Sequence, residues 1–97
     1  MGQEYFDAKN WSMAIEQFTL AIRVNSQLED AYFYRGLAYS NLGQYQRAIQ
    51  DYDKAIQLDP NDAANYVVRA AAYGYLGQGA KEAADEAKAC SLDSQWC

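Results

Sequence analysis

Few side chains in this 97-residue chain have the types and spacing needed for covalent or acid–base chemistry. The sequence contains no histidine, which is the commonest general base, metal ligand and pH-sensitive group in proteins. Most catalytic triads and zinc hydrolases therefore lack their starting residue. No motif places a nucleophile, a base and an orienting group together, so we expect no catalysis, no metal and no cofactor.

The only pair of thiols, Cys90 and Cys97, lies seven residues apart near the end of the sequence. Two cysteines are too few for a disulfide framework, and there is no second pair to complete a zinc site. In one interpretation Cys90 is a small buried apolar residue and Cys97 is mobile. In the other, the tail folds back after Asp93 and the two thiols form a disulfide, which would indicate an oxidising compartment. The spacing alone leaves both states open.

The charged residues give the chain no obvious binding site for a nucleic acid. Eight Lys and Arg against thirteen Asp and Glu give a net charge of −5, and the basic residues are spread along the chain. This distribution offers no basic patch for a nucleic acid backbone. No apolar run approaches the roughly 18 residues that span a bilayer, and no secretory signal follows Met1. We therefore expect no membrane insertion and a cytoplasmic location, or a periplasmic or other extracytoplasmic one if the sequence is part of a longer protein.

The chain repeats itself with a period of 34 residues. Residues 29–62 and 63–96 align without a gap at twelve identical positions, which include Arg35 and Arg69. A period in this range is typical of repeat architectures. We therefore expect a single domain over residues 1–97, composed of a partial repeat (1–28) and two further repeats (29–62 and 63–97).

Apolar residues recur every three or four positions, which is typical of amphipathic helices, and the alternation of a strand is absent. The sequence thus predicts an all-α fold. Gly43 is suited to a helix exit, and Asp62 to capping the helix that follows it. The expected helices cover residues 2–8, 11–24, 29–42, 46–58, 63–76 and 80–91.

The last helix has two possible registers. The gap-free alignment places Glu82 and Glu86 at apolar positions, where buried unpaired carboxylates are unfavourable. One extra residue around 77–79 would move alanines and Cys90 to those positions instead. We prefer this second register, which buries Ala83, Ala87 and Cys90 and turns to solvent Glu82, Asp85, Glu86 and Lys88.

The 34-residue helix pairs resemble the tetratricopeptide repeat (TPR), whose signature is W-x2-L-G-x2-Y followed by A-x3-F and a final Pro. The middle repeat carries this pattern at Tyr32, Gly36, Tyr39, Ala48, Tyr52, Ala55 and Pro60. Arg35 stands where the family has Leu, and Arg69 stands at the same position one repeat later. Because both arginines fall beside core positions, we expect them to pair with nearby acids rather than to bind a ligand. The resemblance implies an α-α superhelix (solenoid) of about three stacked helix-turn-helix units, the first truncated at its N-terminus.

The resemblance also implies a function, that of a non-catalytic scaffold for protein–protein interaction. In the family, the first helix of each pair lines a concave groove that receives a peptide or helix of a partner protein. The corresponding positions here hold Phe6, Asp30, Phe33, Leu37, Asn41, Val67, Ala71 and Tyr75. The alternative for each apolar residue is ordinary packing, and for Asn41 it is a local cap.

Two further expectations concern the partner. One subset of the family holds the C-terminal carboxylate of heat-shock chaperones with cationic side chains, and this chain has no cationic pair at the matching positions. The alternative function is self-association into a homo-oligomer, because no helix follows the last one to cover its apolar side.

Overall fold

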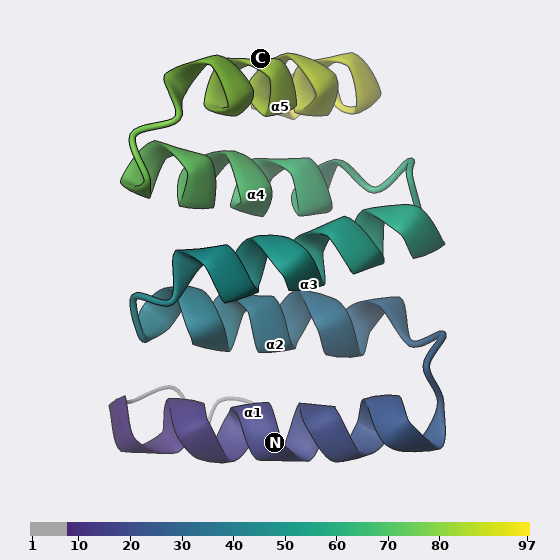
Figure 1. Cartoon of the computed structure of the whole chain (residues 1–97). Helices are drawn as coiled ribbons and strands as arrows, with labels where there is room; N and C mark the ends of the chain where they lie inside the picture. The colour runs from purple at the N-terminus through teal and green to yellow at the C-terminus, as the bar shows by residue number, and fades with distance from the viewer. Residues whose placement is uncertain (1–7) are drawn as a thin grey trace.

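The computed structural model describes residues 8–97, which form five α-helices and a short 3-10 turn in one stack (Figure 1). No residue in this range lies in a β-strand, so the all-α prediction is confirmed. The elements are α1 (Ala8–Val24), α2 (Glu29–Asn41), α3 (Tyr45–Leu58), α4 (Ala63–Tyr75), α5 (Gly79–Leu92) and η2 (Ser94–Trp96).

The helix boundaries agree with the sequence except at the start. Helices α2 to α5 each begin and end within one residue of the expected positions. The expected helix over residues 2–8 lies almost entirely outside the described residues. The break expected at residues 9 and 10 is wrong, because α1 already includes Ala8. Neither Lys9 nor Asn10 is a helix breaker, so nothing in the local sequence ends the helix there.

Glycine ends the first helix of each full repeat. Gly43 and Gly77 have φ angles of 76° and 74°, in the left-handed region that glycine adopts without strain. After each of them the chain reverses, and the backbone N–H of Gln44 donates to the carbonyl of Tyr39 at 2.9 Å. The turn from α3 to α4 ends at Asp62, whose carboxylate accepts the N–H of Ala64 at 3.1 Å.

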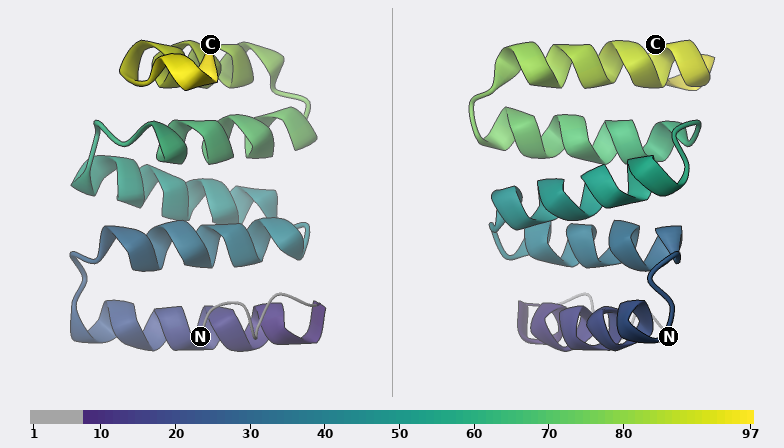
Figure 2. Two further views of the ribbon diagram at one scale, coloured as in Figure 1. Left: turned by 180° about the vertical axis from the view of Figure 1, so that it is seen from behind. Right: turned by 45° about the vertical axis from the view of Figure 1, so that its right-hand side comes forward.

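Each helix packs mainly against its neighbours in the chain (Figures 1 and 2). Gly36 allows the close approach of α2 and α3, because a Cβ there would lie only 2.8 Å from Cδ1 of Tyr52. Ala48 is wholly buried and joins Tyr52 and Ala72 in a core cluster shared by α3 and α4. A large ring beside small residues thus sets the spacing of the helices.

The preferred register of α5 is wrong, and the gap-free alignment is right. Asp85 is buried, whereas Ala83 and Ala87 are exposed. Asp85 is tolerated in the interior because it is paired, accepting two hydrogen bonds from Arg69. Glu82 is half-buried and Glu86 is exposed, because in the described part of the chain no further helix covers that side of α5.

Candidate functional site

Arg35 and Arg69 form equivalent ion pairs one repeat apart. The guanidinium of Arg35 donates from Nε and Nη2 to the two carboxylate oxygens of Asp51, at 2.9 and 2.7 Å. Arg69 binds Asp85 in the same way, with both distances 2.8 Å. The pairing expected from the sequence is therefore confirmed. With their donors engaged inside the stack, these arginines hold helices together.

Each arginine also reaches the preceding repeat. Nη1 of Arg69 donates to Asp53 at 2.9 Å, and Nη1 of Arg35 donates to the hydroxyl of Thr19 at 3.2 Å. Burial raises the pKa of the Asp51 carboxyl, and the adjacent Arg35 opposes this rise without cancelling it. The pKa of Arg35 is raised in turn by its hydrogen bonds to Asp51.

Three carboxylates gather where α2 begins and the α3–α4 turn ends. Single oxygen atoms of Glu29, Asp59 and Asp62 lie within 4.8 Å of one another. The amide of the buried Asn65 donates to Glu29 at 2.8 Å, while its own Oδ1 has no hydrogen-bond partner. Burial raises the pKa of Glu29, and the neighbouring carboxylates of Asp62 and Asp59 add to the rise. Such oxygens are the ligand type that Ca²⁺ and Mg²⁺ prefer, although exposed acidic clusters commonly hold no ion.

On α2, the expected groove residues are divided between the core and the solvent. Phe33 is half-buried, with its ring centroid 6.4 Å from that of Tyr52, and Leu37 packs against the core cluster. Asp30 and Asn41 are exposed. The Asn41 amide donates to the carbonyl of Leu37 at 2.8 Å, as a local cap would.

On α4, three expected groove residues line an open depression. Val67 and Ala71 border a cavity of about 700 Å³ between α4 and α5, and Ala71 also borders a second one of about 330 Å³ beside Tyr75. The two cavities share Ala71 and Glu82 and therefore adjoin, and together we call them the α4–α5 trough. Its lining comprises Val67, Ala70, Ala71, Gly74 and Tyr75 of α4, Glu82, Glu86, Ala87, Ala89 and Cys90 of α5, and Trp96 and Cys97 of the tail.

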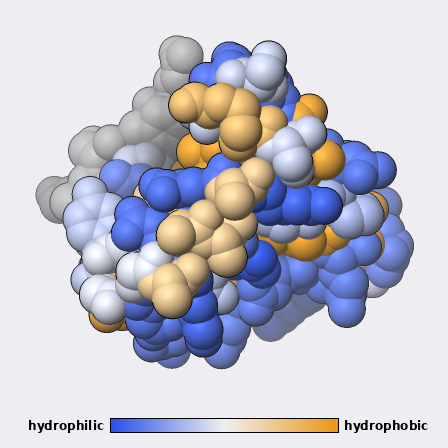
Figure 3. Space-filling model, turned by 90° about the horizontal axis from the view of Figure 1, so that it is seen from above, coloured by the Kyte–Doolittle hydropathy of each residue, from blue (hydrophilic) through white to orange (hydrophobic). Residues whose placement is uncertain are grey.

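The trough has an alanine-rich middle with an exposed aromatic ring at each end. Tyr75 is 73% exposed and stacks on Tyr45 at a centroid distance of 4.7 Å, while Trp96 is 44% exposed. Viewed from the α5 end of the stack, a band of weakly hydrophobic surface runs between hydrophilic areas (Figure 3). The eighth expected groove residue, Phe6, lies outside the described residues.

A model of the tetratricopeptide repeat matches residues 29–62, and a second TPR repeat model matches residues 2–43. The TPR domain of OM64 from Arabidopsis is 31% identical to the chain. The two structures superpose with a TM-score of 0.90, over 97% of this chain and 78% of the OM64 domain. The chain belongs to the tetratricopeptide repeat family.

Other solved structures share this TPR fold. MamA is 28% identical with a TM-score of 0.89 over 97% of the chain, which spans only 55% of MamA. The first TPR domain of Spaghetti (RPAP3), bound to an HSP90 peptide, has a TM-score of 0.89 over 96% of the chain and 74% of its own length. Because that domain is only 22% identical, the likeness concerns the fold alone. No curated protein matches the sequence. TPR domains are generally non-catalytic modules for protein–protein interaction.

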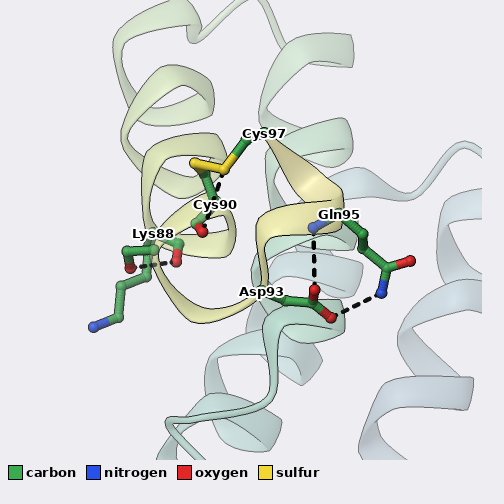
Figure 4. Close-up of a disulfide and its surroundings, with 6 residues drawn as sticks. Lys88, Cys90, Asp93, Gln95 and Cys97 are labelled. Carbon is green, nitrogen blue, oxygen red and sulfur yellow. Dashed lines mark hydrogen bonds between the residues drawn. A yellow bond between two sulfur atoms is a disulfide. The ribbon is translucent and has the colours of Figure 1, made fainter.

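At the end of this TPR stack, the tail folds back and is closed by a disulfide between Cys90 and Cys97 (Figure 4). The carboxylate of Asp93 accepts the backbone N–H of Gln95 at 3.1 Å and its side-chain amide at 2.8 Å. These bonds lower the pKa of Asp93. Of the two states left open by the sequence, the structure has the disulfide, and it holds Trp96 against the trough.

Sequence reasoning missed the tail and the two glutamates as parts of this surface. The 34-residue period could have identified the glutamates. One repeat earlier, the positions of Glu82 and Glu86 are occupied by Ala48 and Tyr52, which face the following helix α4. The acidic cluster was missed because Glu29 precedes Asp59 and Asp62 by 30 residues or more and meets them only through the stacking of the helices. None of the helices within residues 8–97 is long and apolar enough to cross a membrane.

Proposed function

We propose that this TPR chain binds a helical or extended segment of a partner protein in the α4–α5 trough. The observation that carries the proposal is the trough itself, in which an open cavity of about 700 Å³ lined by the exposed Trp96 adjoins a second one of about 330 Å³ lined by the exposed Tyr75. Exposed aromatic rings beside small apolar residues are the usual anchors of a protein interface. On α2, in contrast, the equivalent face is largely filled by the protein's own core.

The chemistry of the trough favours an internal segment over a chain terminus. The TPR domain of Spaghetti holds an HSP90 peptide, so a domain of this fold can hold a peptide. In the present chain, Val67, Val68 and Ala71 supply no cation for a C-terminal carboxylate. We therefore expect a ligand recognised through its side chains.

Self-association is the second candidate function. Its support is the exposed outer face of α5, where Ala83 and Ala87 lie open to solvent. A concentration series in analytical ultracentrifugation tests it, because association through this face predicts dimers that the exposed-face variant Ala83→Glu abolishes. A monomer at all concentrations contradicts it.

We further infer an oxidising compartment, which the Cys90–Cys97 disulfide supports. Mass spectrometry after alkylation of the protein taken from its native source tests this inference. Two alkylated thiols would contradict it.

A position-specific cross-linking experiment tests the proposed function. A photo-reactive amino acid replaces Ala87, which is exposed and lines the trough, and as a matched control it replaces Gln50, which is exposed on α3. We expect a partner segment to be captured from position 87 and not from position 50. Adding Tyr75→Ala should reduce the yield several-fold without unfolding the domain. Equal capture from both positions, or a yield that Tyr75→Ala leaves unchanged, contradicts the proposal.

A further inference from the structure

The α4–α5 trough occupies the same place on the α4–α5 pair that α4 occupies on the α2–α3 pair. Two trough residues, Glu82 and Glu86, stand one 34-residue period after residues of α3. Their counterparts Ala48 and Tyr52 pack with Ala72 of α4 in one buried cluster. The trough is therefore the position that the first helix of a further repeat would occupy.

The tail repeats the turn that leads into α4. The carboxylate of Asp93 accepts the N–H of Gln95 at 3.1 Å. One period earlier, Asp59 accepts the N–H of Asn61, also at 3.1 Å. Cys97 stands 34 residues after the first residue of α4, and its disulfide fixes it to α5. The tail therefore has the form of a turn that leads into a further helix, and the disulfide holds this turn in place.

The chemistry of the trough differs from that of the site that receives α4. There, Ala72, Val68 and Leu76 of α4 meet an alanine and a tyrosine ring of α3. In the trough, both counterparts are carboxylates, Glu82 and Glu86, four residues apart along α5. Within residues 8–97 neither has an ion-pair partner. A wholly apolar helix would leave these charges without compensation.

We propose that the trough takes an amphipathic α-helix of a partner protein that carries two basic residues, three or four positions apart, facing Glu82 and Glu86. This inference rests on the proposed function and names the chemistry of its ligand. Small side chains between the basic residues would lie over Ala71 and Ala87, and an apolar residue would contact Trp96. Charge complementarity between α5 and the ligand then selects the partner.

A second copy of this chain is a poorer occupant. Its net charge is −5, so approach to an acidic trough is unfavourable. Its basic residues on α2 and α4, Arg35 and Arg69, are already bound to aspartates. A basic helix of another protein meets neither obstacle.

Peptides with the sequence of α4 test the proposal. The probe is a fluorescent 16-residue peptide that copies residues 62–77, because α4 is the helix that the preceding pair receives. A basic form carries V68K and A72K, and an acidic form carries V68E and A72E. By fluorescence anisotropy we expect the folded domain to bind the basic peptide at least tenfold more tightly than the acidic one.

Charge reversal on the domain provides the decisive comparison. In the variant Glu82→Lys/Glu86→Lys the preference should invert, so that the acidic peptide binds more tightly. The control variant Glu16→Lys/Gln46→Lys/Gln50→Lys changes the net charge equally at three exposed positions outside the trough and should keep the original preference. Should the charge-reversal variant fail to fold by circular dichroism, Glu82→Gln/Glu86→Gln replaces it, with the preference expected to disappear.

Equal binding of the two peptides, no binding of either, or a preference that survives removal of Glu82 and Glu86 would overturn this inference. The cross-linking experiment separates the proposed function from the chemistry of its ligand. Capture from position 87 without any charge preference leaves the proposed function standing and contradicts the basic-helix inference. Failure of both experiments removes the binding function itself.

Discussion

Arg35 and Arg69 show how one side chain can join three helices. Arg35 on α2 binds Asp51 on α3 and Thr19 on α1, and Arg69 repeats the arrangement one period later. The TPR pattern has leucine at this position. Here a buried ion pair takes its place, and both members rely on each other to offset the loss of water. The consequence is a strong mutual dependence within each pair.

Replacing Asp51 with alanine should destabilise the domain by about 3 kcal/mol, because the guanidinium of Arg35 stays partly buried without its partner. The double variant Arg35→Leu/Asp51→Leu, which restores the family's leucine, should recover much of this loss. Urea denaturation followed by circular dichroism measures both. If the double variant is no more stable than Asp51→Ala, the mutual dependence is refuted.

The acidic cluster at the start of α2 predicts a pH-dependent stability. The pKa of Glu29 is raised above its ordinary value of 4.5, so its ionised form lowers the stability of the folded state. Glu29→Gln keeps an acceptor for Asn65 and should raise the free energy of unfolding at pH 7, by less than about 1 kcal/mol at this partly exposed site. The gain should vanish as the pH falls below 4.5, where the carboxyl is protonated in both states. Thermal melts across pH check this, and a gain that persists at low pH would contradict it.

At the scale of the elements, small residues determine how closely α2, α3 and α4 approach. Ala48 is wholly buried between α2 and α4, and the ring of Tyr52 fills the space beside Gly36. The corresponding positions of α5 hold glutamates on an uncovered surface. The same position in the repeat is therefore intolerant of bulk in α3 and tolerant in α5.

Ala48→Leu should cost about 1 to 3 kcal/mol, because the added atoms force α3 away from its neighbours. Ala83→Leu, at an exposed position of α5, is the matched control and should change stability by less than about 0.5 kcal/mol. Thermal unfolding monitored by far-ultraviolet circular dichroism compares the two. Equal melting temperatures for the two variants would mean that α3 does not pack as described.

Much of this element structure could be predicted from the sequence, and the failures have a common physical cause. The 34-residue period, Gly43 and Asp62 correctly indicated four helices, their turns and the family. The predicted register of α5 was wrong because carboxylates are excluded from apolar positions only where a neighbouring helix covers those positions. At the end of the stack that neighbour is absent from the described chain, so Glu82 stays partly solvated. Among the candidate groove residues, no sequence signal told the packed Phe33 from the exposed Tyr75.

At the scale of the whole molecule, the stack has one end closed by a covalent link. The disulfide between Cys90 and Cys97 connects the tail to α5 and does not touch the repeats before it. In a linear array, each unit is stabilised by itself and by its neighbours. Cutting the link should therefore act locally.

Cys97→Ser should lower the stability by at most about 2 kcal/mol, as expected for a link that closes a short loop. Hydrogen exchange should accelerate in residues 90–97 and remain unchanged around Ala48 in α3, which is remote from the link. The affinity of the basic peptide should change as well, because Trp96 is no longer held at the trough. Faster exchange throughout the domain would contradict the local effect.

The packing of each helix on its neighbours in the chain also bears on how the protein folds. Because every major helix contact joins consecutive elements, no long loop must close before native contacts form. Low contact order of this kind is associated with folding in microseconds to milliseconds. During synthesis each new helix can pack against the helix before it, which has already emerged from the ribosome. The α4–α5 trough includes residues of α5 and of the tail, so it forms only after residues 79–97 have emerged.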